Sequence, residues 1–422
     1  MIYSNNKVMK RNLLHAGALA LLLAACSTTP QSGKQEGQID IVSAFENQTE
    51  LKVSHLGKNI RYVPLETNDS SLVGGTYGIK LQDDMVVVTT SGNCLLFDKH
   101  TGKFLRKIGR KGQGPKEYLD NVSYIHPETG DIYFNRTPEK MIRFNRQGEF
   151  LGELELPFQW DEGCYLSFQG NQVFAHLALW KDKLYRFDTD GTALDSIALP
   201  ANREADFKDI KQPISIAGPL GVQLGSGLFA TNGMFLIQYK SGERQDILPV
   251  HHPSIYAYGD EMRFHEAYND TVYAIEEGLL TPRWIFRTGE YHFPRELYGD
   301  VAESEKRMVV TYVGETEELL FFECAKGWFA PKKVELCNGI YRKKTGTVMI
   351  GKRNEGFTDD LTQFIPFKPL THSAQGEFAG ALNIEDIQKW TEEHPDIKLE
   401  GALAPLKDLA DDANPVVVIV EP

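Results

Sequence analysis

Histidines and carboxylates are the first residues whose types and spacing suggest chemistry, because imidazole and carboxylate groups on adjacent strands can converge on Zn²⁺. His251 and His252 stand together, and His265 precedes Glu266. No histidine occupies the fourth position after His265, so the helical zinc-protease motif is absent, and Pro253 indicates a loop. The three histidines are a candidate metal site, with a loop pair and a half-solvated strand residue as the alternative.

A glycine-rich segment, residues 109–116 (GRKGQGPK), resembles a phosphate-binding loop in its glycine spacing. Pro115 stands where that motif needs its lysine, and Lys116 stands where a Ser or Thr would hold Mg²⁺. The segment therefore predicts a turn that carries the chain between two structural units. If the turn has a function, Arg110 and Lys111 supply cationic groups for a ligand.

Two tryptophans in polar surroundings are candidate ligand contacts. Trp160 lies in the sequence QWDE, and Trp328 follows Gly327. Exposed rings at these positions would stack on sugar faces or hold a peptide, whereas the alternative is ordinary packing in the core.

Signatures of catalysis are missing from the sequence. It contains no Gly-x-Ser-x-Gly elbow, and no cysteine has a neighbouring histidine, so no catalytic residue is assigned. Three pairs of adjacent aspartates lack the spacing of a calcium loop and are expected to be solvated turns (83–84, 359–360 and 411–412). Ca²⁺ or Zn²⁺ as cofactor has no specific motif to support it.

The N-terminus predicts export and lipidation. Lys10 and Arg11 precede an apolar run of about 13 residues, too short to span a bilayer, which needs roughly 20. This run is typical of a signal peptide. It ends in Leu-Ala-Ala-Cys26, which resembles the lipobox of bacterial lipoproteins, so residues 1–25 are expected to be removed and Cys26 acylated. An ordinary secretory signal is the alternative.

Residues 26–50 are expected to be a lipidated flexible tether, since Ser27 to Gln38 has no apolar residue to bury. Cleavage leaves 42 basic and 58 acidic residues, a net charge of -16. This acidity excludes nucleic acid as the expected ligand, because phosphate backbones require clustered Lys and Arg. The remaining 51–422 are expected to form one domain.

Four cysteines remain after cleavage: Cys94, Cys164, Cys324 and Cys337. Cys324 and Cys337 flank a turn-rich stretch and are candidates for a disulfide across neighbouring strands. Buried free thiols are the alternative, and sequence alone leaves the pairing open.

An internal repeat is the strongest signal for the fold. Three segments each contain a short strand that ends in phenylalanine, a turn with glycine, and a second strand (residues 95–108, 141–154 and 184–197). Their phenylalanines, Phe97, Phe144 and Phe187, are 47 and 43 residues apart. Two further short strands precede each of the first two copies. A period in the forties with four strands per unit predicts a β-propeller.

Later parts of the chain follow the pattern less clearly. Residues 235–248 and 271–286 keep the strand-turn-strand pattern, residues 319–350 supply further strands, and residues 201–227 are expected to be an inserted loop. We expect six blades, with seven as the alternative. Near the C-terminus, a helix capped by Asn383 ends near His394, and a second short helix lies around 405–410.

Ring closure requires one blade built from both ends of the chain. The expected contributors are Asn59 to Leu65 (NIRYVPL) and the apolar strand Val416 to Val420.

These residues resemble a known family. NIRYVPLET (59–67), IGRKGQGPKEY (108–118), YNDTVYAI (268–275) and the terminal Asn414-Pro415 look like the NHL-related six-bladed β-propeller lipoproteins of Gram-negative bacteria. The resemblance covers roughly residues 55–422 and implies an all-β propeller and an envelope location. It implies no activity. A lipid anchor in the outer membrane is expected, and its periplasmic face is favoured over the cell surface because no acidic run follows Cys26.

The function favoured by the sequence is non-catalytic binding of a glycan, a peptide or a partner protein where the loops of the ring gather around its axis. The alternatives are a metal-assisted lyase or hydrolase on the axis and an envelope scaffold.

Overall fold

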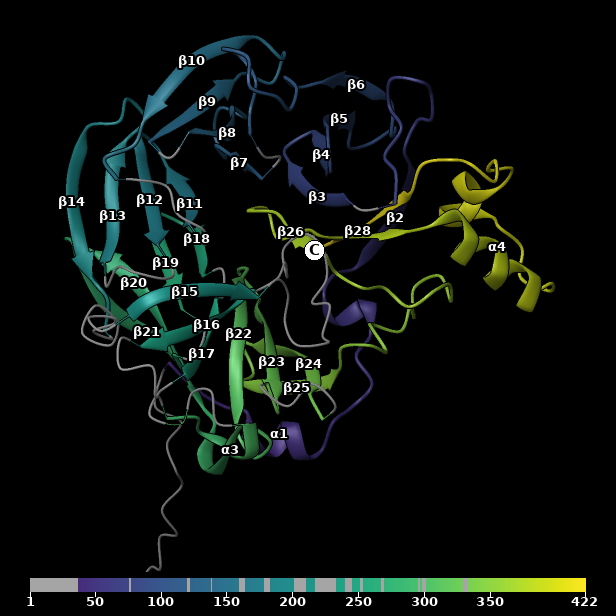
Figure 1. Ribbon diagram of the computed structural model, residues 1–422. Helices are drawn as coiled ribbons and strands as arrows, with labels where there is room; N and C mark the ends of the chain where they lie inside the picture. The colour runs from purple at the N-terminus through teal and green to yellow at the C-terminus, as the bar shows by residue number, and fades with distance from the viewer. Residues whose placement is uncertain are drawn as a thin grey trace, which may run out of the picture. The chain divides into compact units, whose positions relative to one another are not determined.

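The computed structural model describes residues 37–422 apart from short gaps at 76, 120–121, 138, 159–163, 178–182, 201–209, 217–232, 240–244, 251–252, 267–268, 295–296, 298–300 and 329–332. The described chain is built mainly of β-strands, arranged as antiparallel sheets around a common axis (Figure 1). Six of these sheets are the blades of a β-propeller, as the repeat predicts. Within the described residues, no helix is long and apolar enough to cross a membrane.

Each of the first three blades is a four-stranded meander in which the strands pair in chain order. Blade 1 contains β3 (Tyr77–Gln82), β4 (Met85–Thr90), β5 (Cys94–Asp98) and β6 (Phe104–Lys107). Blade 2 contains β7 (Ser123–Ile125), β8 (Ile132–Thr137), β9 (Lys140–Phe144) and β10 (Phe150–Glu155). Blade 3 contains β11 (Cys164–Gln169), β12 (Gln172–Leu177), β13 (Lys183–Asp188) and β14 (Ala193–Ala198).

Blades 4 and 5 repeat this arrangement. Blade 4 contains β18 (Ser254–Tyr258), β19 (Glu261–His265), β20 (Thr271–Glu276) and β21 (Leu279–Arg287). Blade 5 contains β22 (Met308–Glu315), β23 (Leu319–Lys326), β24 (Glu335–Arg342) and β25 (Thr347–Lys352). Short helical turns, η3 (Gly289–Tyr291) and α3 (Val301–Ser304), connect the two blades.

Blade 6 closes the ring with strands from both ends of the chain. Its order is β2 (Asn59–Pro64), β28 (Val416–Glu421), β27 (Phe378–Leu382) and β26 (Thr371–His372). The register pairs Asn59 with Glu421 and Pro64 with Val416, which confirms the predicted closure.

Asn414 fastens the chain beside this closure. Its side-chain Oδ1 accepts a hydrogen bond from the Val73 N–H at 3.0 Å. Its Nδ2 donates to the carbonyls of Glu66 and Ser71 at 2.7 and 2.8 Å. Because all three bonds are made by one buried side chain, Asn414 fixes the loop between β2 and β3 against the last strand.

A seventh sheet lies outside the ring of blades. It contains β15 (Ile210–Ile216), β16 (Gly233–Tyr239) and β17 (Gln245–Val250). Blades 3 and 4, which flank it in sequence, contact each other directly through their inner strands β11 and β18. The expectation that residues 235–248 repeat a blade is therefore wrong. The expectation that residues 201–227 form only a loop is also wrong, because β15 lies within them.

The folded part of the chain begins closer to the N-terminus than expected. β1 (Gln38–Asp40) adds a parallel strand to the outer edge of β21 in blade 4. α1 (Val42–Glu46) then packs beside β25, and η1 (Val53–His55) leads into β2. Ile39 and Ile41 are fully buried, so the folded body begins at Gly37 and the expected tether boundary at residue 50 is corrected.

Two helical elements lie between β27 and β28, as expected. α4 (Ile384–Glu393) begins after Asn383 and ends before His394. The second element, η5 (Gly401–Leu406), is a 3₁₀ helix that begins four residues earlier than expected.

Six hydrophobic clusters of the core lie at the six boundaries between adjacent blades, and a seventh, smaller cluster surrounds Trp328 in blade 5. The repeated phenylalanines occupy successive boundaries: Phe97 packs between blades 6 and 1, Phe144 between blades 1 and 2, and Phe187 between blades 2 and 3. Because each aromatic ring fills the space against the preceding blade, the repeat in the sequence is a repeat of inter-blade packing.

A β-bulge recurs in the outermost strands of blades 1, 2 and 3. In each strand the register shifts around one extra leucine: Leu105, Leu151 or Leu194. These three side chains are 40%, 41% and 48% exposed. The leucines therefore do not contribute to the core.

Cys324 and Cys337 are register partners on β23 and β24. Both are buried free thiols in this structure, as is Cys94.

Candidate ligand-binding site on the propeller axis

The inner strand of each of the six blades carries one polar or aromatic side chain near the axis. In chain order these are Lys80 on β3, Tyr124 on β7, Tyr165 on β11, Tyr256 on β18, Tyr312 on β22 and His372 on β26. We call these six residues the axial ring. All except Tyr124 retain exposed surface, although they lie deep within the blades.

Strand alternation explains the position of these side chains. On β3, the neighbours Ile79 and Leu81 are buried in the cluster between blades 6 and 1. Successive side chains of a strand point to opposite faces, so Lys80 turns toward blade 2.

Contacts between blades that are not neighbours place the ring at the axis. The ring centroids of Tyr256 in blade 4 and His372 in blade 6 lie 6.4 Å apart. Tyr312 in blade 5 is close enough to Tyr165 in blade 3 for that tyrosine to raise its pKa, behind the larger effect of burial. The contact between Tyr256 and His372 skips blade 5, so it is made across the centre of the propeller.

Lys80 is the cation of the axial ring. Its Nζ donates a hydrogen bond to the Ser123 carbonyl and lies 5.5 Å from the centroid of the Tyr124 ring. Burial lowers the pKa of Lys80 to about 8. Among the described residues, no carboxylate forms an ion pair with it.

Tyr312 and His372 form a hydrogen-bonded pair in the ring. Burial lowers the pKa of His372 to about 4, so the imidazole is neutral at pH 7. Burial raises the pKa of Tyr312 well above its usual value, so the phenol keeps its proton. With the hydroxyl donating to Nδ1, the imidazole carries its own N–H on Nε2.

A buried charge network joins blades 4 and 5 beside the ring. The Glu315 carboxylate accepts from Arg263 Nε at 3.2 Å and lies 2.7 Å from Lys343 Nζ. Trp284 Nε1 donates to it at 3.1 Å, and the Tyr256 hydroxyl donates at 3.4 Å. Glu315 is thus fully occupied by protein groups, and the network ties an axial tyrosine to the blade boundary.

The predicted cations Arg110 and Lys111 lie in the turn between β6 and β7. Arg110 pairs with the Glu117 carboxylate, and Lys111 Nζ is 3.5 Å from the Ser91 carbonyl. Both side chains are exposed and neither belongs to the axial ring.

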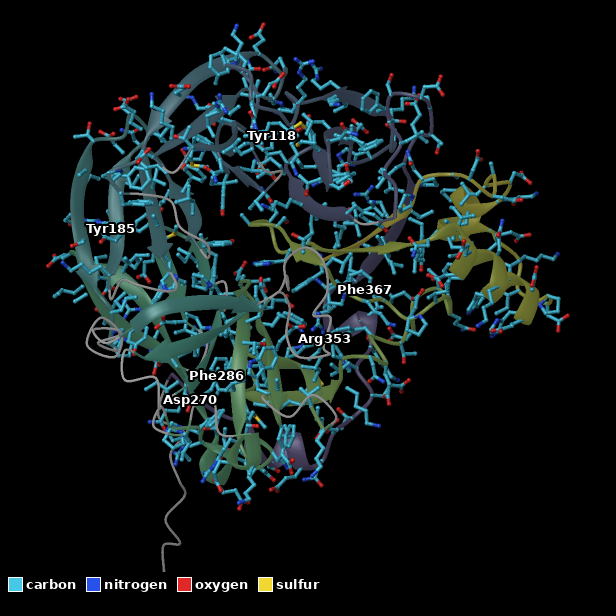
Figure 2. The ribbon with its side chains drawn as sticks, viewed as in Figure 1. Tyr118, Tyr185, Asp270, Phe286, Arg353 and Phe367 are labelled. Atoms are coloured by element: carbon cyan, nitrogen blue, oxygen red, sulfur yellow. The ribbon has the colours of Figure 1, made fainter. Side chains whose placement is uncertain are left out.

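Glycine is required in this turn. Gly109 has a φ of +52°, and a Cβ there would lie 2.8 Å from the Phe144 ring. Tyr118, at the end of the turn, is fully buried and stacks on Phe134 with centroids 4.2 Å apart (Figure 2). The segment therefore has the structural role of joining blades 1 and 2.

The other predicted site residues do not come together in the described part of the chain. Trp328 is 7% exposed and packs with Phe293 and Val309, which matches the packing alternative. His265 is fully buried, and its Nε2 lies 2.9 Å from the Asn269 carbonyl oxygen. Cys26, Trp160, His251 and His252 lie outside the described residues.

The metal prediction remains untested for this reason. Glu266 lies 3.2 Å from His176 Nε2 in blade 3 and joins two blades. No cluster of three metal-ligating side chains occurs among the described residues.

Two concave features of the described chain lie away from the ring: a groove beside α4, and a smaller one beside η3 lined by Tyr291, Arg307 and Lys326. Ile387, Leu399 and Leu406 line the groove beside α4 together with Gln388 and Asp411. It lies at the outer side of blade 6 (Figure 1), and the axial ring contributes nothing to it.

The fold and the ring define a six-bladed β-propeller with a polar, aromatic site on its axis. The chain matches a family defined by a domain of unknown function, DUF4934, over residues 36–421. It therefore belongs to the DUF4934 family.

One solved structure supports the same fold. The crystal structure of a "putative exported protein" from Bacteroides fragilis matches with a TM-score of 0.60 and 17% identity, covering 91% of this chain and 99% of that chain. The WD40 repeats of RRP9 match with a TM-score of 0.39 and 9% identity, covering 88% and 99%. No match was found among curated proteins.

Proposed function

We propose that this protein is an exported, lipid-anchored propeller that binds a ligand at the axial ring. The observation that carries the proposal is the contact across the axis between Tyr256 in blade 4 and His372 in blade 6. Contacts between neighbouring blades join the other members to this pair: Lys80 to Tyr124, Tyr124 to Tyr165, and Tyr312 to His372. Residues needed only for packing between blades would contact the adjacent blade alone.

The chemistry of the ring supports binding rather than a purely structural role. Three of the four tyrosines, Lys80 and His372 keep exposed surface at a position enclosed by protein. Aromatic faces and hydroxyl groups are general means of holding a polar ligand, and enclosure strengthens each hydrogen bond.

Export and anchoring rest on the N-terminal sequence. The basic start, the short apolar run and Cys26 support cleavage and acylation in the cell envelope. The relative from Bacteroides fragilis, described as exported, supports the same compartment.

A binding screen tests the axial site. The folded body, residues 37–422, is screened against glycans and peptides, and each hit is measured again with Tyr165→Ala. Tyr185→Ala is the matched control, because Tyr185 lies on β13 of the same blade and packs on Phe158, away from the ring (Figure 2). We expect binding to be lost only with Tyr165→Ala. A ligand whose affinity is equal in both variants would place binding elsewhere.

Acylation has its own test. Cells that express the full chain are fed radiolabelled palmitate, and we expect the label on the wild type and on Cys94→Ala but not on Cys26→Ser. Equal labelling of Cys26→Ser would refute the anchor.

A further inference from the structure

The charge of the axial ring restricts the class of ligand. At pH 7 the tyrosines and His372 are neutral, because burial raises the pKa of Tyr312 and lowers that of His372. Lys80 is the single cation among the ring's side chains. The ring is therefore a positively charged site within a chain of net charge -13.

The nearby carboxylate does not neutralise this charge. Glu315, which contacts the ring through Tyr256, already lies against Arg263 and Lys343. Its side chain is 1% exposed. It is unavailable to bind a basic ligand. Glu323 also lies near the ring, since it adds to the effect of burial in raising the pKa of Tyr312, and it pairs with Arg353 at 2.8 Å.

Lys80 itself is poised to receive an anion. Its Nζ contacts one carbonyl and one aromatic face, and an ammonium group has three N–H donors. A carboxylate beside Nζ would form a charge-assisted hydrogen bond, which is about twice as strong as a neutral one. Burial away from water raises the free energy of an ammonium group that has no ion-pair partner. Pairing with an anion is therefore more favourable there than it is in water.

The aromatic members of the ring indicate the rest of the ligand. Four tyrosines and a histidine present flat faces and hydrogen-bonding atoms. Flat aromatic faces suit the C–H faces of sugar rings, and phenol hydroxyls suit sugar hydroxyls. Apolar peptide side chains would instead need an aliphatic pocket.

Resting on the proposed axial site, we infer that its ligand is an acidic carbohydrate, a glycan with a uronic acid whose carboxylate lies on Lys80. The tyrosines then contact the sugar rings. The inference differs from the proposed function because it fixes both the class of ligand and the residue that selects it.

Calorimetry with a matched pair of ligands tests the inference. The probes are a uronic-acid trisaccharide and its carboxyl-reduced, neutral counterpart, titrated into residues 37–422. We expect the acidic sugar to bind at least about tenfold more tightly, the gain from one charge-assisted hydrogen bond. Lys80→Met should remove that preference. Lys103→Met, which changes an exposed lysine in the β5–β6 turn, should keep it.

The pH dependence of the wild type gives a second readout that needs no variant. Affinity for the acidic sugar should fall as pH rises above about 8, where free Lys80 loses its proton, and affinity for the neutral sugar should not. A pH-independent preference for the acid would overturn the role of Lys80, even if Lys80→Met failed to fold.

The outcomes separate this inference from the proposed function. Equal affinity for the two sugars, or binding only of a peptide, would overturn the acidic carbohydrate, whereas sensitivity of that binding to Tyr165→Ala would still support the axial site. Binding unaffected by Tyr165→Ala would overturn both.

Discussion

The Tyr312 hydroxyl and His372 Nδ1 lie 2.7 Å apart, which joins the inner strands of blades 5 and 6 by one hydrogen bond. The two residues are 60 positions apart in the chain. With the hydroxyl as donor, the bond selects the tautomer that carries its N–H on Nε2.

Replacement of Tyr312 with Phe should remove the hydrogen bond to His372 Nδ1, so that the imidazole can adopt either tautomer. A hydroxyl that donates to neutral Nδ1 stabilises the unprotonated ring, so its loss should raise the pKa of His372. The free energy of unfolding should fall by about 1 kcal/mol. NMR titration of the His372 ring would measure the pKa, with Tyr185→Phe as control. An unchanged His372 titration would contradict the assigned donor.

Stability should depend on pH through Lys80. Its pKa is lowered from 10.5 to about 8 in the folded protein. Below pH 8 the Lys80 amine is protonated in both the folded and the unfolded state. Between about pH 8 and 10.5 it is protonated only in the unfolded state, so its contribution makes the free energy of unfolding increase with pH. Relative to Lys80→Met, the wild type should gain Tm from pH 8 to pH 10. A constant difference in Tm across that range would show that the buried amine is not titrating there.

Removal of the Asn414 side chain should loosen the loop between β2 and β3. Asn414→Ala loses three buried hydrogen bonds and leaves the groups at Glu66, Ser71 and Val73 without this partner. We expect a loss of roughly 3 kcal/mol, at about 1 kcal/mol per bond. Denaturant titration measures it, and Asn383→Ala, at a surface helix start, is the control. Hydrogen exchange that stays slow at Val73 in Asn414→Ala would count against the clamp.

A buried ion pair between blades 1 and 6 should show strong coupling. Lys99 Nζ lies 2.9 Å from Glu377, and both side chains are nearly buried. Lys99→Met leaves the carboxylate unpaired and should cost about 3 kcal/mol, whereas Lys99→Met with Glu377→Met should cost less than the sum of the single changes. Chemical denaturation of the four proteins completes the cycle. Additive effects would show that the pair contributes no specific interaction.

Much of the propeller is legible in the sequence because its packing is local and periodic. Phe97 and Gly102 mark the third strand and the following turn, and the same residue types recur in blades 2 and 3. The apolar strand Val416 to Val420 has too many buried residues to be an edge, which identifies it as an interior strand of the closing blade.

The parts that differ from expectation lack such local signals. β16 and β17 alternate like blade strands, and only the direct contact of β11 with β18 excludes them from the ring. β1 has three residues, so the apolar alternation of Ile39 and Ile41 is a weak signal inside a polar segment. Both assignments depend on contacts distant in sequence.

The axial ring was predicted as a location but not as residues. A tyrosine within a strand, such as Tyr165, has the same pattern as an inter-blade core residue. Its partner across the axis, Tyr312, is 147 positions away. The available signal was the repeat itself, because the first strand of each unit must be the inner one and its half-buried residues face the axis.

The bulges at Leu105, Leu151 and Leu194, in the outer strands of blades 1, 2 and 3, affect whether molecules of this protein associate with one another at high concentration. A flat outer strand would offer its unpaired amides to the rim of another propeller, but an extra residue twists the edge and breaks the matching spacing. In blade 4, β21 also carries a bulge, at Arg283, and Gln38–Asp40 already pairs with its outer edge. The short strand next to the proposed tether thus also protects a rim against sheet extension between molecules.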